Sequence, residues 1–142
     1  MTIRLGKLKE ARWIPLRGKA QLYCAPINTT LVYAARAAAG QLLVEMIAGG
    51  IAMTKAGASV EGMPDLNDLV AVEATRQSLF LVCLAEMVAS DWRGIFGPEA
   101  DDGEVAFDPA HVASLFTDPE VADSFSRFYL SGHTEVVAEG NV

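Results

Sequence analysis

The sequence predicts a mainly α fold with a small N-terminal β-hairpin, an α+β protein built as a compact helical bundle. Three observations predict it: an alternating apolar pattern in residues 3–25, two long apolar stretches behind helix-capping residues, and two Asp-Pro pairs in the last third. With 142 residues and 51% hydrophobic residues, the chain is long enough for one domain with a real core. We therefore expect a single domain over 1–142.

The hairpin region, 3–25, is broken at Arg17-Gly18, a turn signal between two apolar runs. Trp13 lies before the break and Tyr23 after it. Pro15 cannot donate a backbone hydrogen bond, so its strand is expected at a sheet edge or beside a bulge.

A helical body is expected over 28–131. Asn28 can cap a first helix, which Gly49-Gly50 would end, and 52–64 is typical of a loop or a frayed extension. Asp65 can cap a second helix running to about Ser90, whose second half carries a single charge and should be buried.

Two short helices are expected in the last third. Asp108 before Pro109 is a side-chain cap followed by proline at the first helical position. The next start has two alternatives: Thr117 with Glu120 forms a capping box, or Asp118 caps ahead of the following proline.

The final helix, 120–130, is amphipathic, and Asp123 and Arg127 form a favourable pair four residues apart on it. The tail, 133–142, lacks periodicity and is expected to be flexible.

The net charge of −7 is unevenly distributed. Residues 1–36 hold seven Lys or Arg and one acid (+6), whereas 37–142 hold four against seventeen (−13). Head-to-tail pairing of copies, a homo-oligomer, is one interpretation, and two solvated faces is the other. Nucleic acid is not expected as a partner, because there is no Lys/Arg run and the chain is acidic overall.

The apolar run 31–53 is long enough to span a membrane, but Arg36, Gln41 and Glu45 fall within it and favour a buried helix instead. The N-terminus lacks the pattern of a secretory signal, so we expect no membrane and a cytoplasmic protein.

No catalytic or metal-binding pattern is found. Cys24 and Cys83 have no metal spacing and are expected to be buried and reduced, while His111 and His133 lie in no nucleophile motif. The acidic residues around Asp101 lack the ligand spacing of a calcium loop, and the glycines do not form a phosphate-binding loop. We expect no cofactor, no metal and no enzymatic activity.

The order of these signals resembles a known family. Trp-Arg-Gly-Ile at 92–95, an acidic Gly turn, Phe-Asp-Pro at 107–109 and the segment 115–123 resemble the C-terminal region of tail assembly chaperones of long-tailed phages, and 11–35 looks like their start. The resemblance implies a nonenzymatic chaperone of a phage, prophage or gene-transfer particle. It would act in the bacterial cytoplasm, coat the helical tape measure protein until tail tube protein displaces it, and be absent from the mature particle.

Five aromatic residues are candidates for client contact or self-association, each with a core position as the alternative: Trp13, Tyr23, Trp92, Phe96 and Tyr129. Rival functions are a structural tail or neck component of the particle, a small helical protein-interaction domain, or a small enzyme using Cys83 or His111.

Overall fold

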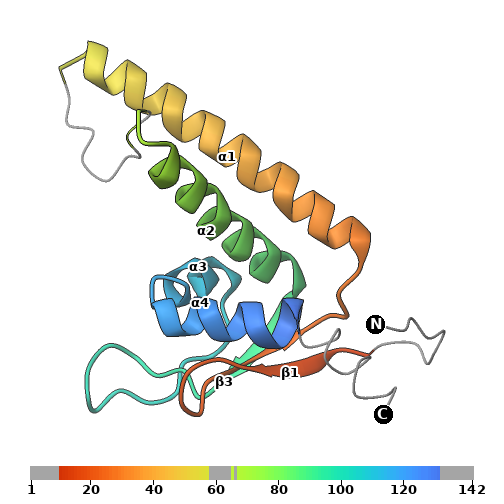
Figure 1. Ribbon diagram of the computed structural model, residues 1–142. Helices are drawn as coiled ribbons and strands as arrows, with labels where there is room; N and C mark the ends of the chain where they lie inside the picture. The colour runs from red at the N-terminus through yellow and green to blue at the C-terminus, as the bar shows by residue number, and fades with distance from the viewer. Residues whose placement is uncertain (1–9, 58–64, 66, 132–142) are drawn as a thin grey trace. The chain divides into compact units, whose positions relative to one another are not determined.

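The computed structural model describes residues 10–57, 65 and 67–131, and the chain divides into two compact units. The first unit comprises 1–28 and 85–142, and the second is Thr29–Leu84. Three predicted segments lie wholly or partly outside the described residues: the start of the hairpin region, most of 52–64, and the tail. A mainly α fold with a small β-sheet is confirmed (Figure 1).

The strands are β1 (Arg12–Pro15), β2 (Gln21–Cys24) and β3 (Ala89–Arg93); the helices are α1 (Thr29–Lys55), α2 (Leu69–Val88), α3 (Val112–Leu115) and α4 (Pro119–Phe125), with a 3₁₀ turn, η1 (Pro109–His111), before α3 and a π-helical turn, η2 (Ser126–Leu130), after α4.

The first unit contains a three-stranded antiparallel sheet in the order β1-β2-β3. The predicted hairpin is confirmed, with Trp13 opposite Tyr23, and β1 with Pro15 lies at the edge. The third strand corrects the prediction of a helix to Ser90. The helix ends at Val88 because four of the next five residues pair with β2, a long-range contact that overrides local helix propensity.

One face of this sheet forms the core of the first unit. Ile14, Leu22 and Trp92 occupy neighbouring positions across the three strands and are all buried. Their helical partners in the buried core are aromatic and aliphatic residues from α3, α4 and the turns after them: Val112, Phe116, Val121, Phe125 and Tyr129. Burial of large apolar side chains provides most of the stabilisation of such a unit.

Polar atoms of the buried aromatic residues are satisfied. The Trp92 indole N–H donates to the Val105 carbonyl at 2.8 Å, and the Tyr129 hydroxyl donates to the Ala25 carbonyl at 2.9 Å. The rings also pack on one another: Trp92 meets Phe107 edge-on with centroids 5.0 Å apart. The first hydrogen bond ties Val105 to β3, and the second ties η2 to Ala25, the residue after β2.

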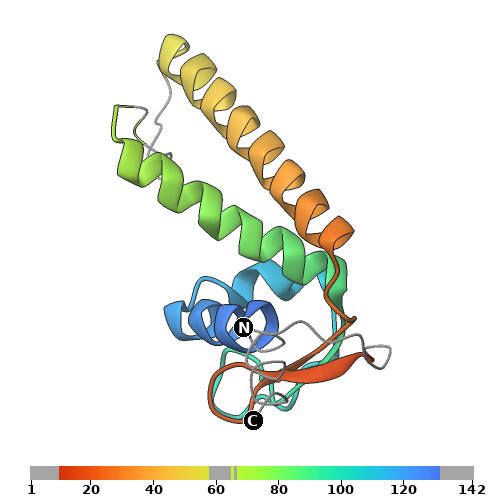
Figure 2. The ribbon, with the colours of Figure 1, turned by 45° about the vertical axis from the view of Figure 1, so that its right-hand side comes forward.

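The second unit consists of α1 and most of α2, which run antiparallel as a helical hairpin (Figures 1 and 2). Within it the guanidinium of Arg36 lies 5.6 Å from the centroid of the Phe80 ring, so the two helices meet there. This contact is a cation–π interaction between α1 and α2.

The first helix does not end at Gly49-Gly50 as predicted. It continues to Lys55, and the chain turns at Gly57, where φ is 78° and the N–H donates to the Thr54 carbonyl. A helical glycine costs only about 1 kcal/mol relative to alanine, which a long helix tolerates, whereas positive φ reverses the chain.

The second helix is capped one turn later than predicted. Asp68 accepts the backbone N–H groups of Val70 and Ala71, at 3.0 and 3.2 Å, whereas the Asp65 carboxylate accepts from Asn67 in the preceding turn. Both aspartates have the side chain a cap requires, so the sequence alone does not choose between them.

The helix starts of the last third follow the Asp-Pro signals. Asp108 caps η1 and Asp118 caps α4, accepting from the N–H groups two residues ahead. The capping-box alternative is wrong, because the Glu120 N–H donates to the Asp118 carboxylate, while the Thr117 hydroxyl donates to the Ser114 carbonyl. The pair of Asp123 and Arg127 is confirmed at 2.8 Å.

Gly94 should be the least replaceable glycine of the sheet. Its φ is 73°, and an added Cβ would lie 2.5 Å from the Lys19 carbonyl oxygen, so we expect Gly94→Ala to cost more than ~2 kcal/mol. Gly18 also has positive φ but open space around it, so Gly18→Ala should cost only about 1 kcal/mol. Urea unfolding of both variants tests this, and equal losses would contradict the close approach.

Candidate protein-interaction surfaces

The five aromatic candidates separate into core and surface. Trp92 and Tyr129 are buried and serve the core, which removes them from the candidate surface. Trp13 and Tyr23 are half-buried on the opposite face of the sheet, and Phe96, just after β3, is 62% exposed. The structure therefore brings together two of the predicted residues and leaves Phe96 on a separate loop.

The first surface is the aromatic face, which we define as Trp13, Tyr23, Gln21 and Arg93. The Trp13 and Tyr23 rings lie with centroids 5.0 Å apart, and the Arg93 guanidinium lies 4.0 Å from the Trp13 centroid. The Arg93 Nε–H donates to the Gln21 side chain, which holds the guanidinium over the ring. Stacking of this kind orients a cation without burying it.

The second surface is the α1 ridge, which we define as Tyr33, Val44 and Ile51. These side chains are 63%, 61% and 45% exposed, although all three are large and apolar. They are spaced by eleven and seven residues, about three and two helical turns, so they share one line along α1. The sequence predictions do not include the ridge, and this spacing is the signal that could have identified it.

The expectation that 31–53 forms a buried helix is wrong for most of its surface. Within α1 the buried residues are Ala35, Ala39 and Leu43, four residues apart along one side. Among the described residues, α1 is the one helix long and apolar enough to cross a membrane by length and composition, and 11% of that window is buried. The same test is passed by helices of soluble proteins and by signal sequences, so the absence of a membrane stays a prediction.

A third feature, the acidic loop, comprises residues 95–105. Phe96 and Glu104 form an isolated antiparallel bridge at its base, where the Glu104 carboxylate also accepts from the Gly94 N–H at 2.7 Å. The Asp102 carboxylate accepts from the Glu99 N–H at 2.9 Å. These carboxylates are therefore used to shape a turn, and no cluster of metal-ligating side chains is found among the described residues.

Both sheet edges are poorly suited to receiving a further strand. On β1, Pro15 has no N–H to offer. On β3, the Trp92 N–H donates to the Asp91 carboxylate at 2.8 Å instead of to another chain. These are common devices against edge-to-edge pairing, so partners are better accommodated on side-chain surfaces.

Among the described residues, those considered for chemistry are not arranged as a reactive site; His133 lies outside them. Cys24 and Cys83 are buried and form no disulfide, as predicted, and burial raises the pKa of the Cys24 thiol to about 12. A thiol that stays protonated at neutral pH is a poor nucleophile. His111 is exposed, with its Nδ1 3.4 Å from the Asp108 carboxylate.

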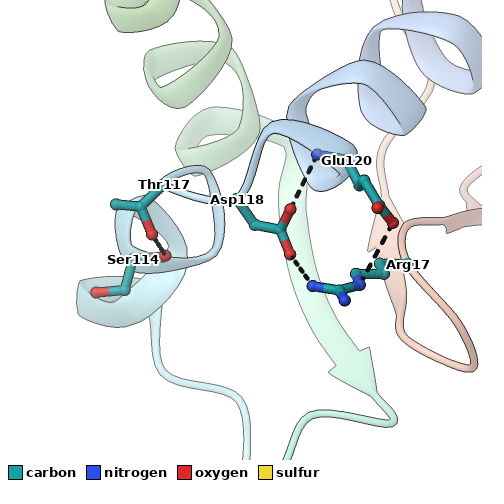
Figure 3. A network of polar contacts seen from close by, with 5 residues as sticks. All are labelled: Arg17, Ser114, Thr117, Asp118 and Glu120. Atoms are coloured by element: carbon teal, nitrogen blue, oxygen red, sulfur yellow. Dashed lines mark hydrogen bonds and ion pairs between the residues drawn. The ribbon is translucent and has the colours of Figure 1, made fainter.

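An ion-pair network ties the hairpin turn to α4 (Figure 3). Arg17 donates to the Asp118 carboxylate at 2.7 Å and lies 3.3 Å from Glu120, while Asp118 also caps α4. The hydrogen bond from Arg17, followed by that from the Glu120 N–H, lowers the pKa of Asp118. The Asp118 carboxylate thus links the hairpin turn to the start of α4.

The melting temperature should fall as acid protonates Asp118. Because its folded-state pKa is lowered, the stabilisation is present above the ordinary aspartate pKa of about 4 and is lost as pH decreases through the lower folded value. Asp118→Asn keeps a capping side chain but has no charge, so its melting temperature should depend less on pH between about 7 and 3. Asp101→Asn, on the acidic loop, is the control; an unchanged pH profile for Asp118→Asn would contradict the network's role.

Comparison of the chain with protein-family models, curated proteins and solved structures finds no match. These surfaces offer contact with other protein: an apolar helical ridge and an aromatic, cationic sheet face.

Proposed function

We propose that this protein is a nonenzymatic tail assembly chaperone of a long-tailed phage, prophage or related gene-transfer particle. It acts in the bacterial cytoplasm, binds the tape measure protein and gives way to tail tube protein during assembly. The observation that supports the proposal best is the α1 ridge: a line of exposed apolar side chains about five turns long on one helix.

The ridge suits an apolar, helical client. From Thr29 to Lys55 the helix carries only Arg36, Glu45 and Lys55 as charged residues, so the line itself offers no charge to an ionic partner. Between its three large side chains lie Ala37, Gly40 and Ala48, whose small size allows the backbone of another helix to approach.

The α1 ridge is also suited to covering a client reversibly. A long amphipathic client exposes an apolar stripe that aggregates when bare, and a helix face of matching length can cover that stripe. Each ridge buries a limited area, so binding of one copy is weak, and many copies along one client act together. Weak individual sites also let tube subunits displace the chaperone stepwise.

The direct test is coexpression with the product of the next long helical reading frame downstream. The proposal predicts that this product is insoluble alone, becomes soluble with the chaperone and copurifies with it. A client that is soluble without the chaperone, or that never copurifies, contradicts the proposal. Retention in purified particles would favour the structural tail or neck component instead.

Charge on the ridge should abolish client binding. Val44→Glu and Ile51→Glu each bury a carboxylate without a partner when a client docks, so copurified client should decrease about tenfold or more. Ala34→Glu is the matched control, because Ala34 is exposed on the same helix but lies off the ridge. If the control and the ridge variants bind equally well while wild type still solubilises the client, the chaperone function stands and the ridge is not its site.

A further inference from the structure

We propose that the aromatic face binds the acidic loop of a second copy of this chain, in a head-to-tail contact. The two surfaces lie in the same compact unit but are made by different residues, and their chemistry is complementary. This contact goes beyond the chaperone proposal and can be tested on the purified protein alone.

The aromatic face presents a positioned cation beside two rings. Arg93 is exposed and stacked on Trp13, and the hydrogen bond to Gln21 uses its Nε–H. That hydrogen bond does not use its two terminal nitrogens, which remain available as donors. A guanidinium held in one orientation loses little side-chain entropy on binding and recognises a carboxylate through paired hydrogen bonds.

The acidic loop offers the matching groups, two of which, the Asp102 and Glu104 carboxylates, also accept backbone N–H groups. It contains Glu99, Asp101, Asp102 and Glu104 and no basic residue, a charge of −4, whereas the charged residue of the aromatic face is the cation Arg93. Phe96 stands exposed at the base of the same loop and can pack on Trp13 and Tyr23. In the proposed contact, the Phe96 ring and the loop carboxylates of one copy therefore meet the aromatic face of the other copy, with its two rings and the Arg93 guanidinium.

A head-to-tail contact between two different surfaces of one chain is heterologous, so a bound pair still has one aromatic face available on one copy and one acidic loop on the other. Such contacts propagate into rings or open rows, unlike a two-fold dimer. A row of copies is also the arrangement in which weak ridges would cover a long client cooperatively. Charge complementarity at a partly exposed contact makes the association dependent on salt.

Sedimentation velocity over a series of protein concentrations tests the contact. Wild type should form oligomers whose average size increases with concentration and whose dissociation constant rises about tenfold or more in high salt. Arg93→Glu, which disables the aromatic face, and Phe96→Ser with Asp101→Ser, which disables the loop, should each remain monomeric. Arg76→Glu on α2 is the matched charge reversal outside both surfaces and should associate like wild type.

Mixing the two disabled chains gives the sharpest outcome. Each carries one intact surface, so an equimolar mixture should form dimers and stop there. Phe96 and Asp101 are exposed, so the loop variant should fold, and circular dichroism checks each chain. A wild type that stays monomeric, variants that associate like wild type, or a mixture that stays monomeric would overturn the inference; undiminished association of both variants would point to the α1 ridge instead.

Discussion

The register of the three strands is the constraint on which the first unit depends. Ile14, Leu22 and Trp92 stand opposite one another, and burying this row places the residues between them on the other face of the sheet. Trp13, Tyr23 and Arg93 reach solvent for that reason. A shift of one residue would exchange the two sets, so core and candidate surface are consequences of one alignment.

Local signals were readable from the sequence and long-range ones were not. The hairpin turn and the cap at Asp108 depend on a few adjacent residues and are predicted correctly, while the cap at Asp118 is one of two alternatives that the sequence left open. Strand β3 depends on pairing with β2, almost seventy residues earlier, and its first residues were predicted as the end of a helix. The same pairing places Trp92 in the core, whereas the half-buried position of Trp13 follows from the β1–β2 register.

The second unit differs from the first in the side chains that it buries and exposes. Its longest helix buries a narrow line of two alanines and a leucine and leaves other large apolar residues exposed, which is costly for an isolated protein and useful for one that covers another. The sheet face, by contrast, combines rings with a positioned charge. Two surfaces of different chemistry allow client binding and contact between copies to be altered independently, so each proposed role can fail without the other.

The proposed function depends above all on α1 being the surface that is covered when the client binds. Hydrogen–deuterium exchange of the purified complex, compared with the free chain, measures this covering residue by residue. We expect slower exchange along α1, particularly between Tyr33 and Ile51, with little change in the core strands. Protection confined to the sheet or to 109–130, with α1 exchanging as in the free protein, would contradict the proposed role of the helix.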